Sequence, residues 1–209
     1  MSDFLYNIYK RTRNGLLHRI YTRRINRRLK NRNFTLFCNN CIGGRIYHSL
    51  GMEFTSPFIN LLVGENADDF VKFLKNREHY LNSELVFIHD GVKKYPRAFL
   101  DDIKIGFVHY KTEDEAVAAW ERRKKRIING RIWVIIYAKQ GISKQDYDEL
   151  TALDYKNIAV IAEKDCIQDF ATDVIPISDK CKNWFSRDKY GFQMYERYFD
   201  FVSFLNKNS

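Results

Sequence analysis

The chain has 209 residues, of which 45% are hydrophobic and 15% aromatic, so it is long and apolar enough to bury a full core. No apolar run approaches the roughly 20 residues that a membrane-spanning helix needs, and arginines interrupt the N-terminal segment where a signal peptide would have its apolar stretch. Four cysteines do not make a disulfide framework in a chain of this length. We therefore expect a cytoplasmic protein with reduced thiols, which excludes the membrane-spanning and disulfide-scaffold classes.

The net charge of +9 belongs to one end of the chain. Residues 1–33 carry ten lysines and arginines against one acid, Asp3, whereas the rest of the chain carries 25 basic and 25 acidic residues. Apolar residues in this segment recur mostly at three- to five-residue steps, which predicts an amphipathic helix that Asn14 and Gly15 would break or kink. The sequence therefore divides into a basic helical arm, 1–33, and a single α/β domain of neutral charge, 34–209.

Three roles can be considered for the basic arm, and two of them fit its sequence. It suits an anionic membrane surface, where each cation contributes about 1 kcal/mol, and such contact would hold the protein at the inner face of the membrane. It could instead pack on its own domain with a solvated cationic face. Nucleic acid is not expected, because no base-stacking array or reading motif accompanies the arm. The cations that would meet a membrane or partner are Arg19, Arg23, Arg24, Arg27 and Arg28.

Short apolar runs alternate with helical patterns after the arm. We expect strands at 34–38, 59–63, 85–89, 103–109, 132–137, 157–162 and 173–177, and helices at 42–50, 67–82, 113–128, 144–153 and 191–206. Several strands are apolar at consecutive positions, as in strands that are covered on both faces. The predicted fold is α/β, with a mostly parallel sheet, helices on both faces and a Rossmann-like second half. A sub-boundary is expected near 139–144, where a polar segment breaks the pattern.

The first expected strand runs into the sequence Cys38-Asn-Asn-Cys41-Ile-Gly-Gly44 before the next helix. A thiol at a helix start meets unpaired N–H groups and the positive end of the helix dipole, which favour the thiolate, so Cys41 is the first candidate nucleophile. Inert packing is the alternative for Cys41, and Cys38 is expected to be a buried apolar residue. Gly43 and Gly44 would either let a ligand approach the backbone or permit a tight turn.

The Cys-x-x-Cys spacing also permits a redox disulfide or half of a zinc site. Zinc is disfavoured because the other two cysteines, Cys166 and Cys181, do not form a second close pair. A thioredoxin-like mechanism is disfavoured because its attacking thiol would be Cys38, inside the strand, and Pro57 follows the motif too soon. We therefore expect no metal and no cofactor.

A second reactive side chain, His109, ends the strand expected at 103–109, and Thr112-Glu-Asp-Glu115 fits a capping box at the start of the following helix. In open α/β sheets ligands bind beyond the carboxyl ends of the strands, and Cys41, His89 and His109 each lie at or just past such an end. His109 could therefore serve as general base toward Cys41. The alternative is a half-buried histidine that bonds to loop carbonyls.

The helix expected at 113–128 places one arginine on its apolar face. Arg123 falls in the same stripe as Trp120, and Arg126 flanks that stripe. A buried guanidinium needs a partner, and the sequence leaves two open. One is a bound carboxylate or phosphate, and the other is an internal acid such as Asp101 or Asp102.

Two groups of residues resemble a known family. The first is Asn39-Asn-Cys-Ile-Gly-Gly44 with Tyr47, Leu50-Gly51 and Ser56-Pro57-Phe58, and the second is Phe107-Val-His109-Tyr110, Glu115-Ala116 and Trp120-x-x-Arg123-x-x-Arg126-Ile127. They look like the two motifs of a bacterial family of unknown function whose members are often labelled exopolysaccharide biosynthesis proteins. The resemblance covers 34–205 and leaves the arm outside. The motifs are also distantly similar to proteins described as papain-like cysteine peptidases.

Together with the residues, this resemblance implies an enzyme of cell-surface polysaccharide production. Cys41 would be the nucleophile and His109 its base, in acyl transfer or hydrolysis on a sugar or lipid-linked sugar. Asn39 and Asn40 would donate hydrogen bonds to a developing oxyanion. The remaining substrate contacts would come from Gly43, Gly44, Tyr110, Arg123 and Arg126.

Three other classes stay open at this stage. A non-catalytic protein of the same pathway would bind a glycan or nucleotide-sugar phosphate through Arg123 and the Gly43-Gly44 turn. A glycosyltransferase is suggested by Asp146-Tyr-Asp148, which has the Asp-x-Asp spacing of metal-dependent members of that class. A membrane or RNA adaptor would act through the arm.

Overall fold

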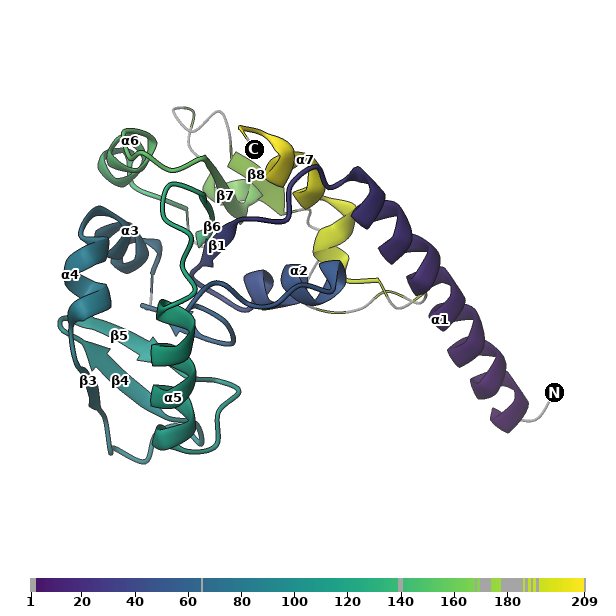
Figure 1. Ribbon diagram of the computed structural model, residues 1–209, viewed down its shortest axis with the longest axis horizontal. Helices are drawn as coiled ribbons and strands as arrows, with labels where there is room; N and C mark the ends of the chain where they lie inside the picture. The colour runs from purple at the N-terminus through teal and green to yellow at the C-terminus, as the bar shows by residue number, and fades with distance from the viewer. Residues whose placement is uncertain are drawn as a thin grey trace.

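The computed structural model describes residues 3–64, 66–138, 141–167, 169, 174–177, 186, 188, 190 and 192–208 (Figure 1). Its helices are α1 (Asp3–Arg28), α2 (Ile42–Leu50), α3 (Ala67–Lys75), α4 (Arg77–Asn82), α5 (Glu113–Lys124), α6 (Lys144–Thr151) and α7 (Phe201–Asn206), with 3₁₀ turns η1 (Lys164–Cys166) and η2 (Met194–Arg197). Its strands are β1 (Thr35–Cys38), β2 (Leu62–Val63), β3 (Leu85–Phe87), β4 (Arg97–Leu100), β5 (Ile103–Gly106), β6 (Ile132–Ala138), β7 (Asn157–Glu163) and β8 (Val174–Ile177). Cys181 and part of the expected 139–144 boundary lie outside the described residues.

Four strands form a parallel sheet in the order β1-β6-β7-β8. Its register pairs Leu36 with Trp133 and Ile135 with Ala159. β1 is buried at all four positions and β6 at six of its seven, because helices cover both faces of the sheet. The predicted α/β class, the Rossmann-like second half and the basic N-terminal helix are confirmed.

The middle of the chain differs from the single, mostly parallel sheet that the alternation predicts. β2, β5, β4 and β3 form a separate antiparallel sheet in that order. β4 was not among the expected strands, and a two-residue turn in which Asp101 has a φ of 55° reverses the chain and joins it to β5. Figure 1 shows α5 lying against this sheet, whose inward residues are apolar and whose outward residues are more exposed.

Two apolar clusters fill the two sides of the parallel sheet. Phe37, Val134 and Ile136 face the cluster that includes residues of α3, α5 and α6. Leu36, Trp133 and Ile135 face the cluster that includes residues of α1, α2 and α7. The alternation along β1 and β6 thus sends successive side chains to opposite cores, as strand geometry requires.

The first and last helices depart from the expected boundaries. α1 continues through Asn14 and Gly15, so the predicted break does not occur. Its N-terminal part extends away from the body in Figure 1, whereas Ile25 is 2% exposed and belongs to the second cluster. The helix expected at 191–206 is divided into η2 and α7, because the Asp200 side chain accepts a hydrogen bond from the Ser203 N–H and starts a new helix.

A side chain closes the outer edge of β1. The Tyr47 hydroxyl accepts a hydrogen bond from the Leu36 N–H at 2.9 Å and bonds to the Thr55 hydroxyl at 2.6 Å. Thr55 in turn donates to the Phe34 carbonyl oxygen. This network ties α2 and the segment after it to the strand that leads to Cys41.

Candidate active site

A cleft of about 390 Å³ lies where α2 begins. It is lined by His18, Cys41, Gly44, Arg45, His48, Ser49, Phe54, Asn60, His109, Gln193 and Glu196. These residues come from α1, from α2 and its N-cap, from the 54–60 loop, from the turn after β5, and from η2 and its N-cap. The cleft therefore joins segments that are far apart in the sequence.

The helix α2 supplies one wall of the cleft. Cys41 is its N-cap residue, and Arg45 and His48 follow at steps of four and three, which places the three side chains on one face. Gly44 lets the neighbouring loop approach this face, because an added Cβ would lie 3.3 Å from Ile59 Cγ2. Gly43 faces the strand instead of the cleft, where an added Cβ would lie 2.9 Å from Cys38 Sγ.

The Cys41 thiol lies at the predicted position but does not have the predicted electrostatics. It is partly buried, and its side chain makes no capping hydrogen bond to α2. Burial raises its pKa above the ordinary value, and the nearby Arg45 charge offsets only part of that effect. Burial of the thiol therefore argues against the expected resting thiolate. Cys38 is fully buried, as predicted, and burial raises its pKa far more.

His109 lies in the turn after β5, is exposed to solvent, and lines the same cleft as Cys41. The two side chains that the sequence paired are thus brought to one cavity. His89 is not among the residues of the cleft, and its ring nitrogen lies 3.3 Å from the Glu113 carboxylate.

Arg123 bonds to a backbone carbonyl and a phenol, and not to the internal acid that was one of its two expected partners. It is 7% exposed, and its guanidinium donates hydrogen bonds to the Ile59 carbonyl oxygen at 3.1 Å and to the Tyr110 hydroxyl. Its charge also lies 5.2 Å from the ring centre of Phe54. Among the described residues no carboxylate pairs with it. Tyr110 donates to the same Ile59 carbonyl, so both side chains hold the loop beside the cleft and do not line it.

The two acids considered for Arg123 are engaged elsewhere. Asp101 bonds to the ring of His79 at 2.7 Å. Asp102 accepts hydrogen bonds from Lys72 and from the Tyr80 hydroxyl, and the Lys72 bond is the main cause that lowers the pKa of Asp102. The internal salt bridge considered for Arg123 is therefore wrong.

Arg126 supports the same loop from the next turn of the chain. Its guanidinium lies 2.7 Å from the Glu53 carboxylate and bonds to the Phe54 carbonyl oxygen at 3.5 Å. Phe54 itself lines the cleft. The arginines of the second motif thus shape the loop that contains Ser56-Pro57-Phe58, the last part of the first motif.

The two asparagines before Cys41 do not line the cleft. The Asn39 amide bonds to the Tyr137 backbone in both directions, at 3.0 and 2.9 Å, and so fastens β1 to β6. The Asn40 side-chain oxygen accepts a hydrogen bond from the Ile42 N–H, and its amide nitrogen is buried with no partner in the described part of the chain. Placing Asn39 and Asn40 at an oxyanion is therefore not supported by their positions.

Asn60 is a cleft residue that the sequence analysis missed. It has a φ of 64°, the left-handed conformation that asparagine tolerates better than other non-glycine residues. Its side-chain oxygen lies close to Gly44, and its preceding carbonyl, that of Ile59, is the one that Arg123 and Tyr110 hold. The apolar run at 59–63 predicted a strand that included Asn60, and the turn at Asn60 was therefore not expected; the strand β2 spans only Leu62–Val63.

The remaining predicted residues lie outside the cleft. Asp146 accepts a hydrogen bond from the Ser143 hydroxyl at the start of α6, and Asp148 pairs with Lys144 at 2.6 Å, so both acids have local roles in that helix. Within the described ranges no group of three or more histidines, cysteines and acids could hold a metal ion. All five predicted contact arginines of α1 are exposed, and one of them, Arg28, pairs with Asp200.

None of the helices in the described part of the chain combines the length and the apolarity that crossing a bilayer requires. The fold and the cleft define an α/β protein with a cysteine and a histidine at one cavity beside the carboxyl end of a parallel edge strand. The chain belongs to the family described as Domain of unknown function (DUF1919), which matches residues 13–206. An uncharacterized protein of Haemophilus influenzae strain Rd is 32% identical over 142 residues, which cover 68% of each chain.

The predicted resemblance to a family of unknown function is thereby confirmed, and its extent is corrected. The match starts at residue 13, so it includes the part of α1 that lies against the body, which the resemblance over 34–205 had left outside. This agrees with the packing, because Ile25 and Leu29 are core residues and His18 lines the cleft.

Proposed function

We propose that this protein is a cysteine-dependent acyl transferase or hydrolase, with Cys41 as nucleophile and His109 as general base. The observation that carries the proposal is that Cys41 and His109, which come from the start of α2 and from the turn after β5, line one cleft. A thiol and an imidazole in one cavity are the minimal pair for nucleophilic acyl chemistry.

Because burial raises the pKa of the Cys41 thiol, the proposed mechanism uses a general base and not a resting thiolate. The Cys41 sulfur forms a bond to the acyl carbon while its proton moves to the His109 imidazole. The carbonyl electron pair moves to oxygen and then returns, which expels the leaving alkoxide with the proton from His109. The resulting thioester is attacked by water or by an acceptor hydroxyl, whose proton passes through His109 and restores the thiol.

Asn60 replaces Asn39 and Asn40 as the proposed oxyanion donor. Its side chain belongs to the cleft, whereas those of Asn39 and Asn40 do not. Arg123 and Tyr110 hold the Ile59 carbonyl and so fix the backbone from which the Asn60 amide projects. A donor held in place before the reaction stabilises a developing negative charge without the cost of reorganisation.

The proposed substrate is an acylated sugar or lipid-linked sugar of cell-surface polysaccharide production. This class rests on the resemblance to proteins labelled for exopolysaccharide biosynthesis. The cleft is compatible with it in polarity, because histidine, arginine, serine and asparagine side chains make up most of its lining.

The test is acylation of the whole protein by an aryl acetate, followed by mass spectrometry of the Cys41 peptide. We expect an acetyl adduct on Cys41, no adduct in Cys41→Ser, and acylation slowed by about 100-fold or more in His109→Ala. Cys166→Ser is the matched control, since Cys166 is also a partly buried thiol but lies outside the cleft. An equal rate in His109→Ala, or an adduct on Cys166 alone, would overturn the proposal.

A second candidate, a non-catalytic binding protein for an anionic sugar, is favoured by the hydrogen-bond donors of the same cleft. Arg45, His18 and His48 line it, and each would donate a hydrogen bond to a bound phosphate. Calorimetric titration with a sugar 1-phosphate separates the two candidates. Binding that survives Cys41→Ser and is lost in Arg45→Ala, together with no acylation of the native protein, would select the binding protein.

A further inference from the structure

The helix α1 has two different faces. His18, Tyr21 and Ile25 follow at steps of three and four, which places them on one side of the helix. This side meets the body: His18 lines the cleft, the Tyr21 ring packs against that of Phe192, and Ile25 is buried. Tyr9, Leu16, Ile20 and Arg27 follow at steps of seven, four and seven on the opposite side, where they are exposed in the part of the chain that the structure describes.

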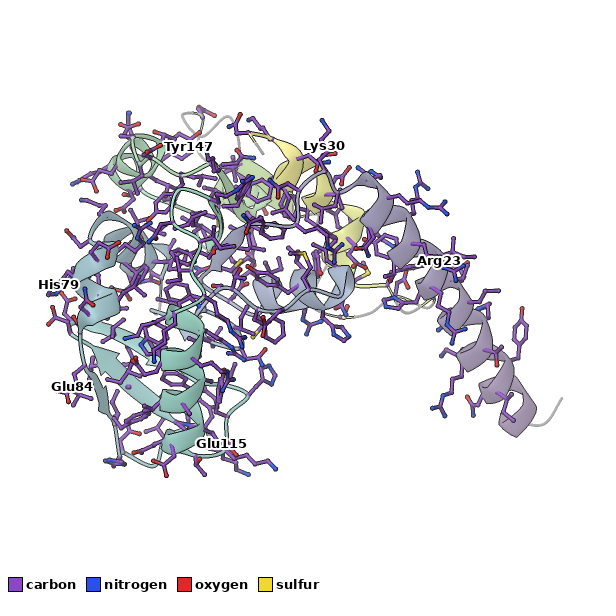
Figure 2. All side chains as sticks on the ribbon, in the orientation of Figure 1. Arg23, Lys30, His79, Glu84, Glu115 and Tyr147 are labelled. Carbon is purple, nitrogen blue, oxygen red and sulfur yellow. The ribbon has the colours of Figure 1, made fainter. Side chains whose placement is uncertain are left out.

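The outward face combines exposed apolar side chains with cations. Tyr9, Leu16 and Ile20 are 57%, 60% and 54% exposed, which is unusual for large side chains along one face of a helix. Around Ile20 the arginines form a shallow groove, whose described lining consists of the α1 residues Ile20, Arg23, Arg24, Arg27 and Arg28. Figure 2, where Arg23 is labelled, shows nitrogen-bearing side chains projecting outward from this part of α1.

The charge of this face identifies the kind of partner that it fits. Residues 1–33 hold ten cations and one acid, so the surface is complementary to a dense layer of negative charge. A second copy of the chain would bring like charges together, and this would oppose pairing of two outward faces. The helix is too polar to span a bilayer, and it carries apolar side chains among arginines. Both features are typical of a helix that lies in the membrane interface.

We propose that the outward face of α1, centred on Leu16, Ile20, Arg23 and Arg27, binds the surface of anionic phospholipid membranes. Leu16 and Ile20 enter the boundary between headgroups and acyl chains, and the arginines contact lipid phosphates. The proposal does not depend on the chemistry proposed for Cys41 and His109, because it rests on the other face of the helix.

The test is flotation of the full-length protein with two kinds of vesicle, pure phosphatidylcholine and an equimolar mixture of phosphatidylcholine and phosphatidylglycerol. We expect binding to the mixed vesicles that weakens with salt, and little binding to the neutral ones. In Arg23→Ser/Arg24→Ser/Arg27→Ser, binding should fall by about 100-fold, since each cation near the surface is worth about fivefold. Leu16→Ser/Ile20→Ser should also lose binding.

A matched control removes the same charge from the body. Lys93→Ser/Lys94→Ser/Lys111→Ser changes three exposed lysines far along the chain from α1 and should bind the mixed vesicles like the native protein. Circular dichroism checks that each variant keeps its helices, so that loss of binding is not loss of folding. Equal binding to both vesicle types, or equal loss in the α1 and control variants, would overturn the proposal. So would a native dimer that Leu16→Ser/Ile20→Ser converts to a monomer without any effect on vesicles.

Discussion

The Arg123 guanidinium donates a hydrogen bond to the carbonyl oxygen of Ile59 at 3.1 Å, across 64 positions of sequence. This bond joins α5 to the loop that carries Asn60 into the cleft. Tyr110 reaches the same carbonyl, and Arg126 holds Glu53 at the start of the loop. Arg123, Tyr110 and Arg126 of the second sequence motif therefore act on the cleft through this loop, whereas His109 of the same motif lines the cleft itself.

Removal of the Arg123 side chain should destabilise the fold. Arg123→Ala leaves the Ile59 carbonyl with one donor fewer and opens a cavity beside Phe54, so we expect the free energy of unfolding to fall by about 2–4 kcal/mol in urea denaturation. Arg122→Ala is the matched control, because Arg122 is exposed on the same helix, and its effect should stay within about 0.5 kcal/mol. Equal effects of the two substitutions would contradict the packing described for Arg123.

Substitutions of Asn60 should distinguish the contribution of its backbone conformation to stability from the contribution of its side-chain amide to activity. Asn60→Gly tolerates the φ of 64°, so its stability should stay within about 1 kcal/mol of the native value, whereas Asn60→Val should cost about 1–3 kcal/mol in thermal unfolding. Acylation by an aryl acetate should fall by about 100-fold in both, because both lack the amide donor. A fully active Asn60→Gly would remove Asn60 from the proposed mechanism.

The two glycines after Cys41 should differ in their tolerance of a methyl group. Gly43→Ala places Cβ 2.9 Å from Cys38 Sγ, so we expect a loss of about 1–3 kcal/mol in unfolding free energy. In Gly44→Ala the nearest atom is the methyl group of Ile59 at 3.3 Å, and the loss should be smaller. The double variant Gly43→Ala/Cys38→Ala should recover part of the loss, and a strictly additive double-mutant cycle would contradict the contact.

The raised pKa of Cys41 predicts how reactivity and stability change with pH. At neutral pH the native thiol should react with iodoacetamide more slowly than a free cysteine, and the rate should rise only at alkaline pH. A thiol whose folded pKa is raised stabilises the fold below its unfolded pKa of about 8.5, and this contribution is lost as pH rises toward the folded value.

Arg45 provides the control for this prediction. Because its charge lowers the pKa of Cys41, Arg45→Ala should move the alkylation profile to still higher pH. Peptide mapping of alkylated Cys41 across the pH range measures the alkylation rate in the native protein and in Arg45→Ala. An alkylation midpoint below that of free cysteine would show that the helix terminus outweighs burial after all.

The sequence predicted the α/β class and the neighbourhood of the site, but partly for the wrong reason. Cys41 and His109 were expected to meet because both follow strands of one parallel sheet. β1 does belong to that sheet, whereas β5 belongs to the antiparallel one. The two residues share a cleft because Tyr110, next to His109, is fixed to the Ile59 carbonyl beside α2.

Other features depend on tertiary contacts that no local pattern contains. The partners of Asn39 and Arg123 are backbone groups far along the chain, which spacing cannot identify. β4 is four residues long and begins with an arginine, so its sequence shows too little alternation of apolar and polar residues to predict a strand. The turn after it was also missed, because Asp101 adopts a left-handed conformation that its residue type does not announce. Cys41 lies at a helix start, as predicted, but its burial depends on the neighbouring segments that line the cleft.

The bond from the Leu36 N–H to the Tyr47 hydroxyl has a consequence for assembly. β1 is the outermost strand of the parallel sheet, and an open strand edge is a template for strands from other molecules. Because a phenol occupies the outward N–H of Leu36, and Thr55 holds that phenol, an incoming strand would have to displace both before it could pair there. The sheet is thereby protected at this edge from recruiting foreign strands and from aggregation that starts with strand pairing.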